Sequence, residues 1–300
     1  MIREPAFAGQ FYEANPQKLR AQIEICFKGK LGPKSMPGRQ ASPIIAAVIP
    51  HAGYVYSGQC AAHAYKAIAE SGKPDTIVLL CPSHTGMGPS VSVYPDGKWK
   101  TPLGEVPVDS EFVNKMLAYS KKASPDEIAH RSEHAIEVHL PFLQYLFKDF
   151  KIVPICMKGI KVLEEANDIV SGILNAAYEL KRKVLVIASS DFTHYGESFM
   201  YTPYKANQIK KVEALDKKAI GFIEKFREID LLKHVVQNNA TICGYAPITA
   251  AIIYARSMKS KSVRLLKYYT SAEITGDSKN FVAYASMVFD KNEGKAKKGK

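Results

Sequence analysis

Three short aliphatic runs dominate this sequence, and each ends abruptly at a polar turn that carries a histidine. They are residues 44–49 before His51, residues 76–81 before His84, and residues 184–189 before Asp191 and His194. Runs of about four to eight aliphatic residues bounded by Gly, Pro or Ser are typical of buried strands in a parallel sheet. Ligands of α/β proteins bind at the carboxyl ends of such strands. The sequence therefore predicts one crevice that receives polar side chains from three distant segments.

Two βαβ units predict the fold class. The first has strands 44–49 and 76–81 around a helix over about 58–70, and the second has strands 151–156 and 184–189 around a helix ending near 180. This alternation predicts an α/β fold with a central, mostly parallel sheet and helices on both faces. Because strands joined by one crossover are usually neighbours, we expect 44–49 and 76–81 to lie side by side.

Three further segments have recognisable patterns. Residues 91–109 alternate and contain Asp96-Gly97, which predicts a hairpin that bends there. Residues 133–147 have apolar side chains at helical spacing and predict one amphipathic helix. Residues 262–272 and 281–289 predict an antiparallel pair at a sheet edge.

Composition narrows the class of protein. The 300 residues are 46% hydrophobic with no break in composition, so we expect one domain over 1–290 and a disordered Lys-rich tail over 291–300. No run approaches the roughly 20 apolar residues of a membrane helix, and no leader pattern opens the chain. We therefore expect a cytoplasmic protein without a membrane partner.

The formal net charge of +12 raises the question of nucleic acid. Part of this charge lies in the tail KNEGKAKKGK, and the other lysines alternate with acidic residues along predicted helices. No RNP-like, helix-turn-helix or zinc-finger pattern accompanies the charge. The sequence favours a solvated basic surface over nucleic-acid binding.

His51 and His84 are the first candidates for a metal site. Each follows a predicted strand directly, and each has a glycine two residues later, Gly53 and Gly86, where backbone can approach closely. One such histidine is often only a polar turn residue. Two at equivalent positions favour a shared metal ion.

Asp191 and His194 stand three residues apart in the turn SSDFTHYG. A carboxylate and an imidazole at this spacing can face one cavity, where His194 acts as a general acid or base and Asp191 orients it or adds a ligand. A turn-forming aspartate beside a surface histidine is an equally good interpretation.

Cys243 precedes a predicted helix that starts near Gly244. A thiol at a helix N-terminus can serve as a nucleophile or a soft metal ligand, although a structural cysteine is the simpler interpretation. The five cysteines are widely spaced without a C-x-x-C pair, which argues against a disulfide framework or a zinc ribbon. Glu133, His134 and Tyr54 are candidates for contact with a substrate.

Eight segments in order carry a resemblance to a known family. They are REPAFAGQFY, PHAGYVYSG, PSHTG, TPLGEVPVD, SEHAIEVHLPFL, ASSDFTHYG, ATICGYAPI and TSAEITGDSKNFVAYAS. Together they resemble the Memo family, named after a human mediator of ErbB2-driven cell motility, over nearly the whole chain.

The resemblance implies a fold like that of the class III extradiol (LigB-type) dioxygenases, which hold non-haem Fe(II) with two histidines and a carboxylate. Memo-like proteins have two histidines and a cysteine there, which the resemblance places on His51, His84 and Cys243. Asp191 and His194 lie beside this set. Iron and copper have both been proposed as the metal of the family, and a thiolate ligand makes zinc a third candidate.

Two functions follow from the resemblance. One is a metal-dependent, dioxygenase-like oxidoreductase. The other is a binding protein without catalysis that uses the crevice for a phosphorylated or carboxylate ligand, as the human protein is described to bind phosphotyrosine peptides, or that carries copper or iron. The crevice accepts a small molecule or a peptide in either case, and the sequence leaves homo-oligomerisation open.

Overall fold

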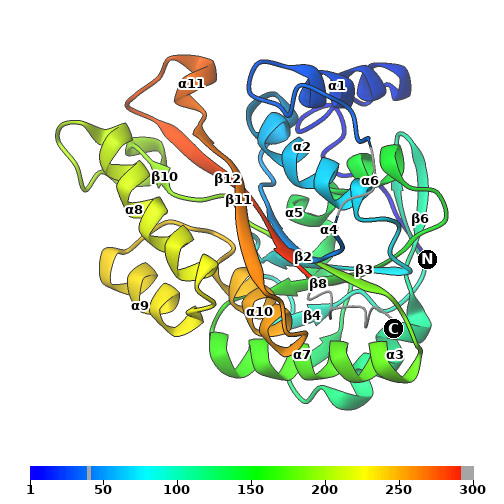
Figure 1. The fold of residues 1–300 in the computed structure, drawn as a ribbon. Coiled ribbons are helices and arrows are strands. Elements are labelled where there is room, and N and C mark those ends of the chain that lie inside the picture. Colours follow the sequence, from blue (N-terminus) through cyan, green and yellow to red (C-terminus); the bar gives the residue numbers. More distant parts are fainter. Residues whose placement is uncertain (39–41, 292–300) are drawn as a thin grey trace, which may run out of the picture.

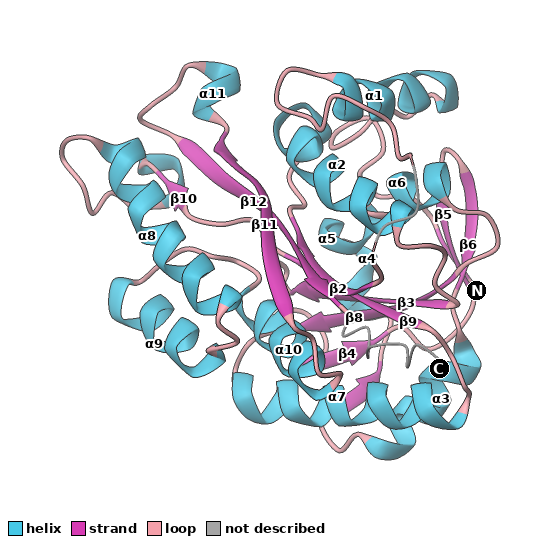
Figure 2. Ribbon diagram, in the orientation of Figure 1, coloured by secondary structure: helices cyan, strands magenta, loops and turns pink. Residues whose placement is uncertain are grey.

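Four aliphatic strands form the centre of the fold, as Figures 1 and 2 show. In spatial order they are β2 (Ile44–Ile49), β9 (Val184–Ser189), β3 (Thr76–Pro82) and β8 (Lys151–Met157). All neighbouring pairs are parallel, and every side chain except the first of β8 is buried. Strands covered on both faces need such continuous apolar sequences. The computed structural model describes residues 1–38 and 42–291.

Further strands, most of them antiparallel to their neighbours, extend this centre on both sides. Beyond β2 lies β12 (Phe281–Asp290), which pairs with β11 (Ser262–Thr270) and β10 (His194–Tyr195); beyond β8 lie β4 (Val91–Val93) and β7 (Ala123–Pro125). The predicted antiparallel pair is confirmed as β11 and β12. A separate sheet contains β1 (Ile2–Arg3), β5 (Lys98–Thr101) and β6 (Gly104–Pro107).

Helices cover both faces of the central sheet (Figure 1). One face carries α1 (Pro16–Lys28), α2 (Tyr54–Glu70), α5 (His134–Glu137) and α6 (Leu140–Leu146), with α4 (Ile128–Arg131) before α5. The other face carries α3 (Ser110–Tyr119), α7 (Val162–Glu179) and α10 (Tyr245–Ser257). Helices α8 (Gln208–Glu224) and α9 (Glu228–Asn238) lie on the β11 side, and η1 (Glu197–Phe199) and α11 (Ala272–Thr275) are short turns. The predicted α/β class is confirmed.

The strand order differs from the prediction. We expected β2 and β3 to be neighbours, but β9 lies between them and pairs with both. The first crossover leaves a gap one strand wide, and the second crossover returns the chain into that gap. Ser189 at the end of β9 therefore lies between the turns that carry His51 and His84.

Two local predictions were also wrong. The Asp96-Gly97 turn joins strands of different sheets, because β4 pairs with β8, and the hairpin is formed by β5 and β6 instead. The single helix predicted over 133–147 is broken after Glu137. Pro141 has no N–H to donate to the carbonyl of Glu137, and its ring would clash with that carbonyl in a continuous helix.

The buried carboxylate of Glu137 anchors the N-terminal arm, residues 3–12. It accepts hydrogen bonds from Arg3 Nη1 and the Tyr12 hydroxyl, both at 2.6 Å, and from the backbone N–H groups of Ala6 and Phe7, both at 2.9 Å. Arg3 also donates to the carbonyl of His130 at 2.8 Å. These contacts hold the arm against α5, next to the turns at the strand ends.

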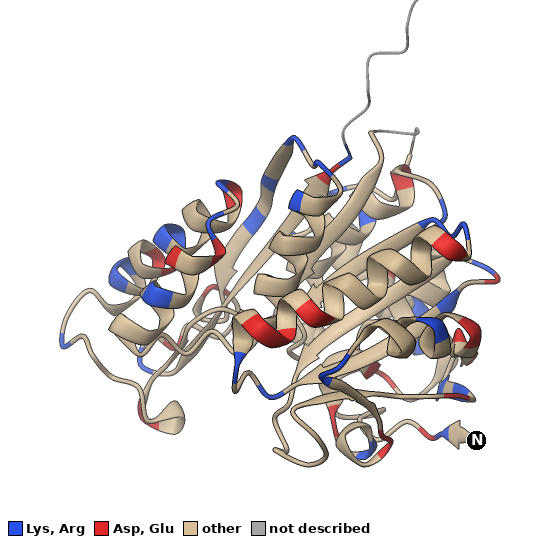
Figure 3. Ribbon diagram, turned by 90° about the horizontal axis from the view of Figure 1, so that it is seen from below, with Lys and Arg blue, Asp and Glu red and all other residues tan. Residues whose placement is uncertain are grey.

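Figure 3 shows that Lys and Arg positions alternate with Asp and Glu positions along the helices and loops. Within residues 1–38 and 42–291, no helix combines the length and the apolar character that a membrane crossing requires. The tail predicted over 291–300 lies outside the described residues from 292 onward. All five cysteines are free thiols.

Candidate metal centre

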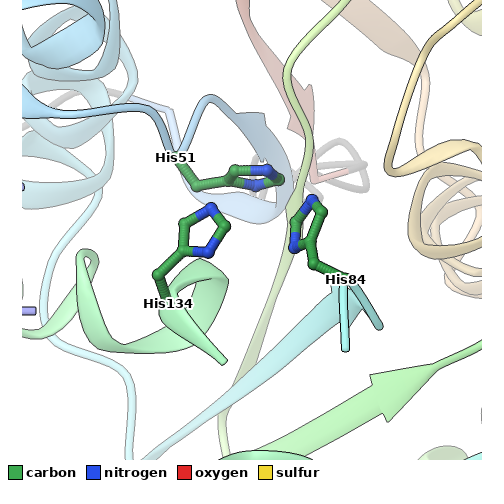
Figure 4. Close-up of side chains that lie close together, drawn as sticks. All are labelled: His51, His84 and His134. Carbon is green, nitrogen blue, oxygen red and sulfur yellow. The ribbon is translucent and has the colours of Figure 1, made fainter. Parts of the chain in front are cut away.

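Three imidazoles from separate segments meet at the carboxyl ends of the central strands (Figure 4). His51 follows β2, His84 follows β3, and His134 begins α5. Each offers a ring nitrogen within 4.8 Å of the others, and burial decreases from His51 through His134 to His84. Imidazole nitrogens at such separations are suitable ligands for a transition metal. This cluster could hold a metal ion.

His51 is fixed from two directions. Its Nδ1 lies 2.7 Å from Ser189 Oγ, and its backbone N–H donates to Asp191 Oδ1 at 2.9 Å. Burial, and then the neighbouring imidazoles of His84 and His134, lower the pKa of His51 well below its usual value. The ring is therefore neutral at pH 7 and retains a lone pair for a cation.

His84 is held by Glu133, whose side chain is fully buried. One carboxylate oxygen accepts the Nδ1–H of His84 at 2.8 Å, and the other accepts its backbone N–H at 2.7 Å. Burial alone would raise the pKa of Glu133, but the hydrogen bond from His84 and the nearby imidazoles outweigh burial and lower it. A carboxylate behind an imidazole is the usual support of a metal-binding histidine.

His134 has a different orientation from the other two. Its ring stacks on His84, with centroids 4.6 Å apart and planes at 26°, and also packs against Phe11 at 4.6 Å. Imidazole lone pairs lie in the ring plane, so the lone pairs of stacked rings run side by side rather than converge. Burial and the proximity of His84 lower the pKa of His134 to about 4. The ring is a neutral, partly buried wall of the site.

Cys243 lies next to the His51 ring. Its Sγ is 3.3 Å from His51 Nε2 and accepts the backbone N–H of Asp191 at 3.3 Å. The residue precedes Gly244, the N-cap of α10. Loss of solvent, and then the charge of Asp191, raise the pKa of Cys243, so the thiol keeps its proton unless a cation replaces it. The structure thus brings Cys243 next to His51, whereas the imidazoles that cluster with His51 are those of His84 and His134.

His194 and Asp191 lie beside this group. The Nδ1–H of His194 donates to the carbonyl of Thr241 at 2.9 Å, and its backbone N–H donates to the Thr241 hydroxyl at 2.8 Å. The neutral tautomer that this contact selects has no hydrogen on Nε2 of His194. Burial raises the pKa of Asp191 despite the nearby His194. Thr241, not Asp191, supplies the acceptor that orients His194.

A cavity of about 470 Å³ opens next to these residues. It is lined by the imidazoles of His134 and His194, by the carboxylates of Asp191 and Asp277, and by aromatic rings from several elements: Phe11, Tyr56, Phe199, Phe281 and Tyr284. Among the described residues, none that lines this cavity is a lysine or an arginine. A larger hollow of about 800 Å³ between α7 and α9 contains none of the predicted site residues.

Two predicted substrate contacts lie outside the cavity lining. Glu133 is buried behind His84, and the Tyr54 hydroxyl donates to the carbonyl of Val138 at 2.6 Å. Their substrate role stays a prediction. Sequence reasoning did not single out Ser189, Thr241 or Phe11, which support or line the site. Only Ser189 carried a signal, as the polar last residue of an aliphatic strand.

Comparison with known proteins identifies the family of this chain. The family described as Memo-like protein matches residues 3–288. A MEMO1 family protein of Methanopyrus kandleri is 43% identical over 292 residues, covering 96% of this chain and 99% of the relative. Relatives of the same description from Methanothermobacter thermautotrophicus and Sulfolobus acidocaldarius are 42% and 43% identical, each over 96% of this chain and at least 99% of their own length. This chain belongs to the Memo family.

Proposed function

We propose that this protein is a metal-dependent, dioxygenase-like oxidoreductase that binds iron or copper through His51, His84 and Cys243 and acts on a small molecule in the adjacent cavity. One observation carries the proposal. The Nδ1 atoms of His51 and His84 are hydrogen-bonded to Ser189 and Glu133, so their Nε2 atoms remain available as metal ligands. Nε2 of His51 lies 3.3 Å from the thiol of Cys243. Such outer contacts are characteristic of metal-binding histidines.

Cys243 suits the third ligand position better than His134 does. Around a tetrahedral ion with ordinary bond lengths, a nitrogen and a sulfur ligand lie roughly 3.6 Å apart. The observed separation of 3.3 Å between His51 Nε2 and Cys243 Sγ is close to this value. His134 stacks on His84 and faces the cavity, which suits contact with a substrate.

The protein's own residues supply the remaining chemistry. The ion, when bound, would supply Lewis acidity and one-electron chemistry. His194, with a bare Nε2 at the cavity wall, accepts a proton from a hydroxyl group of the ligand. Asp191 fixes the His51 turn through the backbone of His51. The aromatic lining excludes water around the ligand.

The charges around the cavity favour a neutral small molecule over an anion. The part of its wall that the structure describes has two carboxylates and no lysine or arginine, and the imidazole of His134 is neutral at pH 7. Phosphate recognition ordinarily requires charged donors such as arginine. The alternative of a binding protein for a phosphorylated or carboxylate ligand therefore has less support. The free thiols favour a cytoplasmic location.

The test begins with elemental analysis after anaerobic reconstitution with Fe(II) or Cu(I). We expect about one ion per chain in the wild type and in His63→Ala, a control histidine that contacts Leu31 outside the cavity. We expect loss of the ion in His51→Ala and Cys243→Ser. His134→Ala should keep the ion and lose oxygen consumption with aromatic or diol substrates.

Three results would contradict the proposal. A wild-type protein that binds no metal would refute the site altogether. If His134→Ala loses the ion while Cys243→Ser retains it, the ligands are the three histidines. A loaded protein that consumes no oxygen with any substrate of the screen argues for metal binding without catalysis.

A further inference from the structure

We propose that Ser189 is a positioning residue that sets the tautomer of His51 and is itself locked by a buried chain of hydrogen bonds from His139 and Tyr65. The tautomer follows from the structure alone. Its importance for metal binding rests on the proposed function.

Ser189 Oγ has three partners at the same distance of 2.7 Å. They are the carbonyl of Ala135, Nδ1 of His51 and Nε2 of His139. A hydroxyl group has one proton to donate and two lone pairs to accept with. The carbonyl can only accept, so the Ser189 proton goes to Ala135. Both imidazole nitrogens must then donate to Ser189.

This count fixes the protons of His51. Its Nδ1 carries the hydrogen that Ser189 accepts, so Nε2 is bare. Nε2 is the nitrogen that faces Cys243 Sγ at 3.3 Å. The opposite tautomer would leave Nδ1 and the remaining lone pair of Ser189 Oγ facing each other without a proton and would place a hydrogen where the metal binds. Ser189 thus holds the His51 ring ready to bind the ion.

His139 and Tyr65 complete the lock. His139 is buried with no carboxylate among its hydrogen-bond partners, so a second proton on its ring would be an uncompensated buried charge. With Nε2–H directed at Ser189, its Nδ1 is the acceptor for the Tyr65 hydroxyl at 2.6 Å. Tyr65 is fully buried on α2. Each proton in this series of hydrogen bonds from Tyr65 to His51 therefore has only one allowed position.

The two proposed imidazole ligands are thus supported differently. Nδ1–H of His84 donates to the carboxylate of Glu133, whereas Nδ1–H of His51 donates to the neutral hydroxyl group of Ser189. A carboxylate makes the imidazole in front of it more basic, and a hydroxyl group does so less. Ser189 therefore acts by determining which nitrogen of His51 carries the proton, and it adds no charge to the site.

The test is a long-range ¹H–¹⁵N spectrum of metal-free protein labelled at its eight histidines. In the wild type we expect protonated Nδ1 and bare Nε2 for His51, and the opposite pattern for His139. Ser189→Ala should give His51 a mixture of tautomers and lower the affinity for Fe(II) or Cu(I) about 10- to 100-fold. Ser189→Thr, which keeps the hydroxyl group, should restore both.

Two further variants separate this role from stability. Tyr65→Phe should leave the Nε2–H of His139 in place, because Ser189 still requires that donor, and should lower metal affinity less than Ser189→Ala. Ser286→Ala removes another buried serine, one that donates to the carbonyl of Cys60, and should leave both histidine patterns unchanged.

The outcomes distinguish the two proposals. A proton on Nε2 of His51 in the wild type would overturn the inference, as would a Ser189→Ala protein with wild-type tautomers and affinity. Wild-type protein with the expected tautomers but no affinity for metal would refute the proposed function and still support the tautomer assignment.

Discussion

Replacing Glu137 with glutamine tests how firmly the N-terminal arm is held at the site. The carboxylate is fully buried and accepts four hydrogen bonds, including the ion pair with Arg3 at 2.6 Å. Glutamine has the same shape but only one acceptor oxygen. With that oxygen toward Tyr12, its amide N–H₂ faces two donors, the Arg3 guanidinium and the N–H of Ala6.

The cost can be estimated from these contacts. Removing one partner of a buried ion pair usually destabilises a protein by about 3–5 kcal/mol, because a buried charge is left uncompensated. Arg3 keeps its bonds to the carbonyls of His130 and Glu133 at 2.8 and 2.9 Å, so the lower end applies. We expect a loss of about 3 kcal/mol, a large part of the about 5–15 kcal/mol of a typical domain.

A single tryptophan makes the assay direct. Trp99 is the only one in the chain, is fully buried, and has the Arg3 guanidinium 4.2 Å above its ring. With a slope of about 3 kcal/mol per molar urea, the midpoint should fall by roughly 1 M. Trp99 emission of the folded variant should also change, because the guanidinium above the ring loses its carboxylate partner.

A matched control and a double variant complete the experiment. Glu24→Gln removes an exposed carboxylate paired with Lys28 and should leave the midpoint unchanged. Arg3→Met combined with Glu137→Gln should cost less than the two single changes together. An unchanged midpoint and an unchanged emission spectrum in Glu137→Gln would refute the role assigned to this carboxylate.

Three further predictions concern pH, packing and metal. Burial raises the pKa of Asp216 from 3.8 to about 7. Its contribution to the free energy of unfolding is therefore complete below pH 4, decreases by about 4 kcal/mol as pH rises to 7, and is constant above pH 7. Chemical denaturation of Asp216→Asn across this pH range should no longer show the decrease. A Cβ at Gly244 would lie 2.4 Å from the carbonyl oxygen of Ser189. Gly244→Ala should therefore lower the free energy of unfolding measured in urea by about 1–3 kcal/mol and weaken metal binding. Gly221 has open space around it in α8, so the control Gly221→Ala should raise stability by roughly 0.5–1 kcal/mol. When the free metal concentration is 100 times its Kd, metal binding should stabilise the folded protein by about 2.7 kcal/mol. A chelator should remove this stabilisation and lower the melting temperature measured by calorimetry.

Local patterns predicted the central strands of this fold. The bounds of β2 and β9 agree with the aliphatic runs, and β3 and β8 differ by one residue, because a continuous buried strand has a nearly unambiguous sequence signature. Their order was not predictable in this way. All four runs are equally apolar and in contact with their neighbours, so no side chain specifies which run lies beside which. The position of β9 between β2 and β3 is determined by the tertiary packing of the whole domain.

The candidate site was predictable as far as chemistry follows strand ends. His51, His84 and Asp191 were found because each comes directly after a buried strand. Cys243 does not follow a strand, and its place 3.3 Å from His51 depends on how α10 packs under the sheet. Phe11 reaches the cavity only because Glu137 anchors an arm more than 120 residues away in sequence. Such contacts have no local pattern.

The unexpected strand order also explains why the site is built as it is. Had β2 and β3 been neighbours, their histidines would have shared an edge with no strand between them to carry a supporting group. With β9 in the gap, Ser189 lies behind His51, and Asp191, two residues later, receives the backbone N–H of the same histidine. One strand end thus fixes both the ring and the backbone of His51. A change in β9 that moves Ser189 should therefore disturb His51 before it disturbs His84, whose support comes from Glu133 at the N-cap of α5.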